Sequence, residues 1–331
     1  RRKIAMPTKV ERRQREFPGG RVEGVPGLHE NVEVWDFSQM YSTIMRSWNI
    51  SPETLRIFTP TNPPDDPDKY IVSPITHLVK LFFQVAARWG KERGYEVKYS
   101  WKNYSVSIDG ISEDDYKTIK ADCLREINKK ITLMSMDTLS YFIKKFKSEH
   151  VEEVLDPEYD PDEDDDIPYI QVTTYGLEYR YVRQPYFLKE PRSVVAQMLD
   201  TFVAKRNEAK AMMKKYKEGT PEYKLWNAYQ LAYKLMGNVV FGYMGSNKTR
   251  CYSHDLCCSI TVGGQTVRNL TAKGARERFH WQTVAGDTDS FFAKHAKKPR
   301  DIVTLRQEFA DWFVPFLSKA LKKFFNIDEH C

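Results

Sequence analysis

The first half of the chain alternates short apolar runs with polar segments that are rich in Pro and Gly. This pattern is typical of strands joined by turns. Ser112, with Asp115 three residues later, marks the start of a long helix that we expect to continue to about Met134. The further elements predicted here are a helix over 74–93 and strands over 32–35, 95–108 and 169–188.

Apolar residues recur at helical spacing in the second half of the chain. Pro191 is placed in the first turn of the first helix there, since proline suits that position. The predicted helices cover 191–216, 222–240, 255–278 and 302–325, and the first two form an antiparallel hairpin. Between the last two, residues 282–293 have two apolar arms around a Gly-Asp turn, which indicates a β-hairpin. The mixture predicts an α+β fold.

Composition excludes several classes of protein. The 331 residues are 41% hydrophobic and 29% charged, which is enough apolar sequence to bury a core. We find no apolar run of about 18 residues and no N-terminal signal sequence, so no membrane span is expected. Five cysteines without a C-x-x-C pair favour a reducing, intracellular compartment and indicate neither zinc nor disulfides.

Charge is distributed unevenly along the sequence. Residues 152–166 hold ten acidic and no basic side chains, and we expect them to form a disordered loop. The net charge is +6, and setting aside those ten negative charges leaves +16. Such an excess suits a polyanion such as nucleic acid, although a merely soluble basic protein has the same signature.

Three aspartates are candidates for a divalent-metal site. Asp287 and Asp289 lie at the predicted hairpin tip, where an i, i+2 spacing on extended backbone directs both carboxylates to one side. Asp36 follows the apolar run 32–35 and is the candidate third ligand. The alternative for the pair is a solvated turn, and for Asp36 a helix cap. The apolar residues on both sides of Asp287 and Asp289 weaken the solvated-turn alternative, because buried carboxylates are costly without a cation.

The helical hairpin supplies candidate phosphate ligands. Arg206 and Lys210 are four residues apart on its first helix, and Lys234 and Asn238 have the same spacing on the second. Basic pairs of this kind are common on solvated helices. Lys234, however, lies in an apolar stretch, where an ammonium group requires an anion or a carboxylate.

Four ordered motifs together resemble the polymerase core of family B DNA polymerases. The segment 36–44 (DFSQMYSTI) is similar to D-F-x-S-L-Y-P-S-I, and 49–55 continues the likeness. The segment 234–242 (KLMGNVVFG) resembles K-x-x-x-N-S-x-Y-G, and 286–290 (GDTDS) resembles Y-G-D-T-D-S. The segment 17–20 (FPGG) is similar to Y-x-G-G. The likeness covers 17–58 and about 190–293, and it leaves 60–185 without a counterpart.

The resemblance implies a role for each matching residue. Asp36, Asp287, Asp289 and the carbonyl of Phe37 would bind two Mg²⁺ ions, with Mn²⁺ as a substitute. Lys234 would also act in catalysis, and Tyr41 would exclude a ribose 2′-hydroxyl. The implied nucleotide-binding residues are Ser38, Gln39, Met40, Tyr41, Arg206, Lys210, Lys234 and Asn238. The implied DNA-binding residues are Gly19, Gly20, Phe241 and Gly242.

The resemblance also implies a domain organisation. Residues 1–31 would be a linker from an exonuclease region, 32–59 and 243–331 two parts of a palm, and 190–242 helical-hairpin fingers. Residues 60–189 would be an α/β insertion that contains the acidic run. The family's thumb would lie beyond Cys331, so we expect a fragment or one subunit of a split polymerase. Phe241 in place of the family's Tyr removes one hydroxyl near the nascent base pair.

The expected function is template-directed DNA synthesis from dNTPs on a primer 3′-hydroxyl. Expected partners are primer–template DNA, a separate chain that supplies thumb or exonuclease, and a processivity factor. Three alternatives remain: a non-catalytic scaffold derived from a polymerase, a protein-primed polymerase, and a basic nucleic-acid-binding module with coincidental carboxylates. Protein-primed members of the family carry an insertion before the first palm motif that contacts the terminal protein. Only about 15 residues separate Gly20 from Asp36, which leaves no room for that insertion and argues against the protein-primed alternative.

Overall fold

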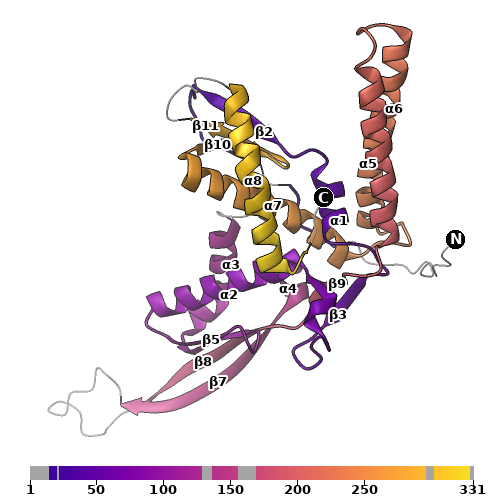
Figure 1. The fold of residues 1–331 in the computed structure, drawn as a ribbon. Helices are drawn as coiled ribbons and strands as arrows, with labels where there is room; N and C mark the ends of the chain where they lie inside the picture. Colours follow the sequence, from indigo (N-terminus) through magenta and orange to yellow (C-terminus); the bar gives the residue numbers. More distant parts are fainter. Residues whose placement is uncertain (1–14, 21, 129–135, 156–168, 296–301, 329–331) are drawn as a thin grey trace.

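The computed structural model describes residues 15–20, 22–128, 136–155, 169–295 and 302–328. These residues form three parts, which Figure 1 shows as a sheet with long helices, a tall helical hairpin beside it, and a lower part of strands and helices. All strand pairs in the three sheets are antiparallel. The predicted α+β class is therefore confirmed for the described residues.

The first sheet collects strands from both ends of the chain. Its order is β1 (Val22–Gly24), β10 (Gln282–Asp287), β11 (Ser290–Lys294) and β2 (Val32–Asp36). The helices beside it are α1 (Met40–Ser47), α7 (His254–Phe279) and α8 (Ile302–Phe325). The β10–β11 hairpin turns at residues 288 and 289, two residues later than the Gly-Asp turn that the sequence indicated.

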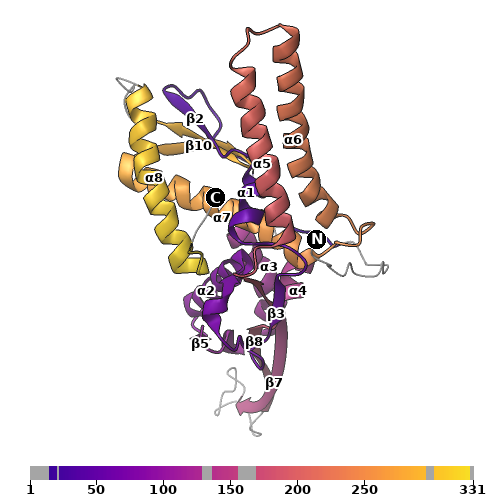
Figure 2. The same cartoon turned by 45° about the vertical axis from the view of Figure 1, so that its right-hand side comes forward.

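The helical hairpin consists of α5 (Val194–Met213) and α6 (Pro221–Gly245), which lie side by side in both views (Figure 2). Ser193 caps α5 by accepting a hydrogen bond from the Ala196 N–H, 3.0 Å away. Thr220 caps α6 in the same way, with Pro221 in the first turn. The prediction that α5 starts at Pro191 was wrong, because the Ser193 cap sets its first helical residue.

The lower part contains two small sheets. One has the order β3 (Leu55–Phe58), β9 (Gln184–Leu188), β4 (Tyr70–Val72), and the other β5 (Glu96–Ser100), β6 (Ser105–Ile111), β8 (Tyr169–Tyr181), β7 (Ile143–Leu155). The helices are the 3₁₀ turn η1 (Pro67–Lys69), α2 (Pro74–Glu92), α3 (Glu113–Asn128) and α4 (Met136–Phe142). The predicted cap is confirmed, since the Asp115 N–H donates to Ser112 Oγ at 3.3 Å.

The sequence pattern misplaced the segment after α3. The predicted long helix is present as α3 from Glu113 to Asn128, and its expected continuation to Met134 falls on residues 129–135, which lie outside the described residues. Strand β7, which the sequence pattern did not predict, includes residues 152–155 of the acidic run. β7 pairs with β8 along its whole length, from Ile143 opposite Tyr181 to Leu155 opposite Tyr169. Backbone pairing therefore stabilises a strand whose charged side chains show little apolar alternation. Residues 156–166, the rest of the predicted loop, lie outside the described residues.

Three apolar clusters form the core. One joins α2 and α3 to the β6–β8 strands, a second surrounds α1 and α7, and a third packs Phe291 and Trp281 against Phe309 of α8. Within the described ranges, Cys123, Cys251, Cys257 and Cys258 carry free thiols. None of the described helices is both long enough and apolar enough to cross a bilayer.

Candidate active site

Strand pairing brings two distant aspartates together. Asp36, the last residue of β2, lies opposite Ser290 at the start of β11. The N–H of Phe37 then donates to the backbone carbonyl of Asp289 at 2.8 Å. Asp36 and Asp289, 253 positions apart in the sequence, are thus held near each other by the pairing of β2 with β11.

The turn places Asp287 and Asp289 differently from the prediction. Asp287 ends β10, whereas Asp289 lies in the turn after Thr288, whose φ is +43°. The same-side rule for i and i+2 applies to extended backbone only, so it does not hold across this turn. Asp289 lines the cavity that also contains Asp36, and Asp287 is not among its lining residues.

Negative charge is concentrated around Asp289. Its pKa is raised first by burial and then by the neighbouring Asp36 and, less strongly, Asp287, while Lys234 acts in the opposite direction. Carboxylates that oppose one another's ionisation provide the oxygen ligands that Mg²⁺ prefers. Among the described residues no group of three or more Asp, Glu, His or Cys side chains could hold a metal ion. The three-carboxylate group predicted from sequence is therefore not assembled, and the pair Asp36 and Asp289 remains.

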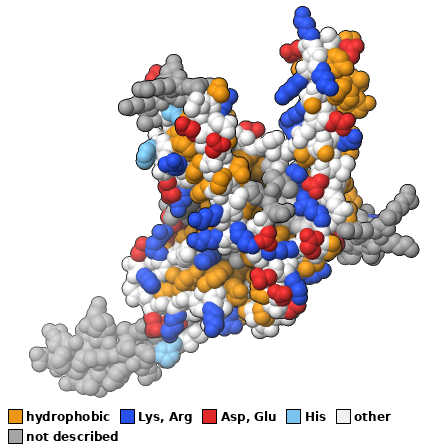
Figure 3. Space-filling view, in the orientation of Figure 1, with side chains coloured by type: hydrophobic (Ala, Val, Ile, Leu, Met, Phe, Trp, Pro, Cys, Tyr) orange, Lys and Arg blue, Asp and Glu red, His pale blue; other side chains and the backbone are white. Residues whose placement is uncertain are grey.

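A cavity of about 540 Å³ lies between the first sheet and the helical hairpin. Figure 3 shows the surface hollowed between these parts, with Lys and Arg side chains along the near side of the hairpin. The lining residues are Asp36, Ser38, Gln39, Met40, Tyr41, Arg206, Lys234, Asn238, Phe241, Thr288 and Asp289. All but Thr288 were candidates from sequence. Phe37, Lys210, Gly19, Gly20 and Gly242 do not line the cavity.

Three cations of the hairpin, Arg206, Lys210 and Lys234, form no ion pair with a described carboxylate. Arg206 is buried, its Nη1 has no hydrogen-bond partner among the described residues, and its Nε lies 3.5 Å from Gln230 Oε1. Burial lowers the pKa of Arg206. The pKa of Lys210 is lowered by burial and then by three nearby cations, Arg206 and Lys234 among them. Crowded cations of this kind, one of them buried, require an anion.

Aromatic rings form one wall of the cavity. The Tyr41 ring lies 4.7 Å from that of Phe241, and Phe17 packs edge-on against Phe241 at 6.1 Å. Burial, followed by the nearby Asp289 charge, raises the pKa of Tyr41. Tyr41 is therefore a neutral, supported ring next to the carboxylates.

Two glycines allow close packing at the β10–β11 turn. A Cβ on Gly20 would occupy the position of the Thr288 side chain. A Cβ on Gly286 would occupy that of the Arg268 guanidinium, which is 1% exposed. Arg268 donates from Nη2 to Glu23 at 2.5 Å and from Nε to the Ser290 carbonyl at 3.0 Å. Arg268 thus ties α7 to β1 and β11.

Sequence reasoning missed Arg268, Glu23 and Thr288. The signal for Arg268 was its position in 254–275, a segment almost entirely buried in the structure. An arginine among buried positions requires a carboxylate partner, and Glu23 lies 245 residues away. Nothing in the sequence near either residue identifies the other.

Replacing Gly286 by alanine is expected to lower the free energy of unfolding by about 1–3 kcal/mol, because the new methyl group displaces the Arg268 guanidinium. Gly24→Ala is the control, since a Cβ at that strand position meets nothing within 4 Å. Urea unfolding of both variants measures the difference. Equal stability of the two variants contradicts the packing described here.

The raised pKa of Asp289 predicts a pH-dependent stability. A carboxyl group whose pKa is higher in the folded than in the unfolded chain weakens the fold above that pKa and has no effect well below both values. In EDTA at neutral pH, Asp289→Asn is therefore expected to raise Tm, and the gain should shrink as the pH falls. Calorimetry across acid and neutral pH measures it. A lower Tm for the variant at neutral pH is the opposite result.

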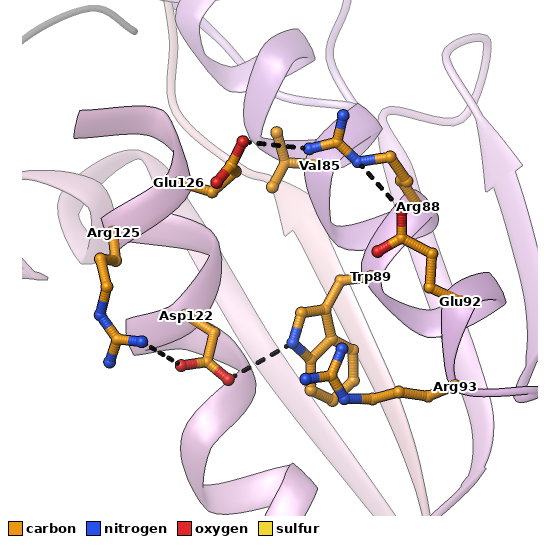
Figure 4. A pocket seen from close by; sticks show the side chains of 8 residues that line it. All are labelled: Val85, Arg88, Trp89, Glu92, Arg93, Asp122, Arg125 and Glu126. Carbon is orange, nitrogen blue, oxygen red and sulfur yellow. Dashed lines mark hydrogen bonds and ion pairs between the residues drawn. The ribbon is translucent and has the colours of Figure 1, made fainter. Parts of the chain in front are cut away.

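A second hollow, between α2 and α3, has a different character. It measures about 460 Å³ and is lined by alternating guanidinium and carboxylate groups around Trp89 (Figure 4). Arg88 faces Glu92 at 3.7 Å and Glu126 at 3.4 Å, and Arg125 faces Asp122 at 3.1 Å. These charges neutralise one another, in contrast to the cations of the cavity beside Asp36.

Comparison with known proteins identifies the family. The sequence model of the family described as DNA polymerase family B matches residues 141–312, which is more than half of the chain. The chain therefore belongs to the family B DNA polymerases. The match includes Arg206, Lys234 and Asp289 and begins after Asp36. It also extends the likeness into 141–185, where the motifs gave no counterpart.

Individual relatives match segments of the chain. DNA polymerase 2 of Aeropyrum pernix is 33% identical over 109 residues, and the DNA polymerase of Archaeoglobus fulgidus is 30% identical over 144 residues. The alignments cover 33% and 44% of this chain but only 13% and 17% of those relatives. Among solved structures, the family B DNA polymerase from Pyrobaculum calidifontis matches 95% of this chain and 25% of its own, with a TM-score of 0.47 and 20% identity.

Proposed function

We propose that this chain carries the nucleotidyl-transfer site of a template-directed DNA polymerase. The observation that supports it is the division of charge in one cavity. Asp36 and Asp289 lie on the sheet side, and Arg206 and Lys234, without a carboxylate partner among the described residues, lie on the hairpin side. A deoxynucleoside triphosphate with bound cations complements both sides, since its phosphates match the guanidinium and ammonium groups.

The residues divide the work of the reaction. The primer 3′-oxygen attacks the α-phosphorus, the bond to the β-phosphate breaks, and pyrophosphate leaves. Arg206, Lys210 and Lys234 orient the phosphates, and Lys234 donates a proton to the leaving pyrophosphate. Asp36, Asp289 and the Phe37 carbonyl are the candidate ligands for Mg²⁺, which when bound lowers the pKa of the 3′-hydroxyl and neutralises the developing charge.

The described parts overlap the subdomains that we assign: palm (32–59 and 243–331), fingers (190–242), insertion (60–189) and linker (1–31). The first sheet lies mainly in the palm ranges, the α5–α6 hairpin in the fingers, and most of the lower part in the insertion. Two strands cross these bounds, since β1 of the linker range pairs in the first sheet and β3 of the palm range pairs in the lower part. The match to the family from residue 141 supports the fingers and the second part of the palm.

Primer extension on four templates that differ only in the templating base tests the proposal. With Mg²⁺ and dNTPs, the chain should add the complementary nucleotide to a labelled primer on each template, and EDTA should abolish addition. Addition that ignores the templating base contradicts the proposal. Binding of dNTP and DNA without any addition supports the scaffold alternative instead.

Sugar selection provides a separate prediction. Tyr41→Ala is expected to raise ribonucleotide incorporation relative to deoxynucleotide incorporation by about 10- to 100-fold, because a supported ring at the cavity wall no longer occupies the space of a 2′-hydroxyl. Tyr41→Phe keeps the ring and should retain the discrimination. Comparison of kcat/KM for the two nucleotide types measures the effect, and unchanged selectivity in Tyr41→Ala refutes this role.

A further inference from the structure

A hollow of about 570 Å³ lies at the edge of the palm sheet, away from the catalytic turn. It is formed by the last turns of α7 and by strands β1 and β10. Gln282, at the start of β10, lines it, whereas Asp287 ends the same strand at the catalytic hairpin. The complete lining is Glu23, Asn269, Ala272, Lys273, Arg276, His280, Trp281, Gln282 and Thr283. We call this hollow the edge pocket.

One wall of the edge pocket is cationic. Lys273 and Arg276 are three residues apart on α7 and share a face, and His280 caps that helix. Arg276 has no carboxylate within 4 Å among the described residues. The one partner of Lys273 is Glu277 at 3.9 Å, with both side chains 63% exposed, so that pairing is weak.

The pocket also offers neutral hydrogen-bonding groups, Asn269 from α7 and Gln282 and Thr283 from β10. The side chains of Asn269, Gln282 and Thr283 make no hydrogen bond to any other described residue, although all three line the pocket. Glu23 also lines it, but its carboxylate accepts a hydrogen bond from Arg268 at 2.5 Å and its charge is paired. The pocket therefore combines one unpaired and one weakly paired cationic side chain, Arg276 and Lys273, with free amide and hydroxyl donors.

Two comparisons within the molecule indicate that these charges are unusual. In the hollow between α2 and α3, Arg88 and Arg125 face carboxylates within 4 Å (Figure 4). The helix macrodipole favours basic residues in a last turn, which accounts for Arg276 and for Arg278 on the other side of α7. It does not account for Lys273, nearly two turns before the helix end, or for the unused donors of Asn269, Gln282 and Thr283.

We propose that the edge pocket binds a phosphate group, either of a DNA strand or of a free polyphosphate. The guanidinium of Arg276 suits two phosphate oxygens at once, and Lys273 adds a point charge. The neutral donors of Asn269, Gln282 and Thr283 complete the set of hydrogen bonds. The volume lies within the range typical of small-ligand sites and accommodates a pyrophosphate or one nucleotide of a strand.

Binding measurements in EDTA without dNTP test this site independently of catalysis. We compare wild type with Arg276→Gln, and Arg278→Gln is the matched control on the same helix, exposed and outside the pocket lining. The probes are inorganic pyrophosphate, by calorimetry, and an oligonucleotide duplex without terminal phosphates, over a range of salt concentrations. Circular dichroism shows whether each variant retains its helix content.

The result expected is loss of one phosphate contact in Arg276→Gln alone. If the ligand is a DNA strand, the slope of log K against log salt falls by about one for this variant and not for Arg278→Gln. If it is a free polyphosphate, pyrophosphate affinity falls about 10-fold in Arg276→Gln with the DNA slope unchanged. Equal behaviour of Arg276→Gln, Arg278→Gln and wild type with both probes overturns the proposal, whatever the outcome of primer extension.

Discussion

Replacing Asp289 by asparagine is expected to lower the rate of primer extension by on the order of 10²- to 10³-fold. The substitution keeps the size of the side chain and removes one of the two carboxylates that line the cavity. The charge of Asp36 disfavours the ionised form of Asp289, which shows that the two carboxylates are close. A cation bound between Asp36 and Asp289 would therefore lose one of its two charged ligands in this variant. Single-turnover extension of a labelled primer with saturating Mg²⁺ measures the rate.

Asp287→Asn is the matched control for this substitution. Asp287 is two residues away on the same hairpin but does not line the cavity, so its replacement should cost less activity than that of Asp289. Urea unfolding of the two variants excludes a general loss of structure. Equal extension by wild type and Asp289→Asn eliminates the assigned role.

Lys234→Gln is expected to lower kcat/KM for the incoming nucleotide by about 10- to 100-fold, the cost of one charge-assisted hydrogen bond. Lys234 lines the cavity, acts on the charge of Asp289, and forms no ion pair with a described carboxylate. If Lys234 also donates a proton to pyrophosphate, Lys234→Gln should lower kcat in addition to raising KM. Steady-state incorporation at several dNTP concentrations separates the two effects.

Lys224→Gln is the corresponding control. Lys224 lies on the same helix ten residues earlier, is exposed, and does not line the cavity. Its replacement should leave both kcat and KM within about twofold of wild type, as surface substitutions generally do. If Lys234→Gln and Lys224→Gln reduce kcat/KM by the same factor, the loss reflects the change in net charge. The proposed contact between Lys234 and the nucleotide phosphates is then contradicted.

Local features of the fold were predictable from the sequence. The α5–α6 hairpin was readable because Gly219 and Pro221 separate two long apolar patterns, and a polar residue caps each helix. The β10–β11 hairpin was readable from its two apolar arms. The turn was placed two residues early because Gly286 resembles a turn glycine, whereas in the structure it makes room for Arg268.

Elements that depend on distant partners were not predictable. β7 carries Lys144, Lys145 and Lys147 where an ordinary strand would alternate apolar and polar residues, and its pairing with β8 stabilises it. A pattern method has no access to that pairing. Residues 129–135, into which the predicted helix would have continued, lie outside the described residues.

In the candidate site, too, local features were predictable from the sequence and contacts between distant residues were not. Asp36 was recognisable because it ends an apolar run and Asp289 because it lies in a turn between two apolar arms, and the β2–β11 register brings them together. The expectation that Asp287 and Asp289 point to the same side was wrong because it assumed extended backbone through the turn at Thr288. The Arg268–Glu23 pair was missed because a buried ion pair between α7 and β1 leaves no local pattern.

Titration of the chain with Mn²⁺ in the presence of a dNTP, followed by electron paramagnetic resonance, tests most directly whether the carboxylate pair binds cations beside the phosphate ligands. Mn²⁺ takes the oxygen ligands that suit Mg²⁺ and is visible to the method. We expect bound Mn²⁺ in wild type that depends on the nucleotide and is lost in the Asp36→Asn, Asp289→Asn double variant. The same Mn²⁺ binding by wild type and the double variant would contradict the account.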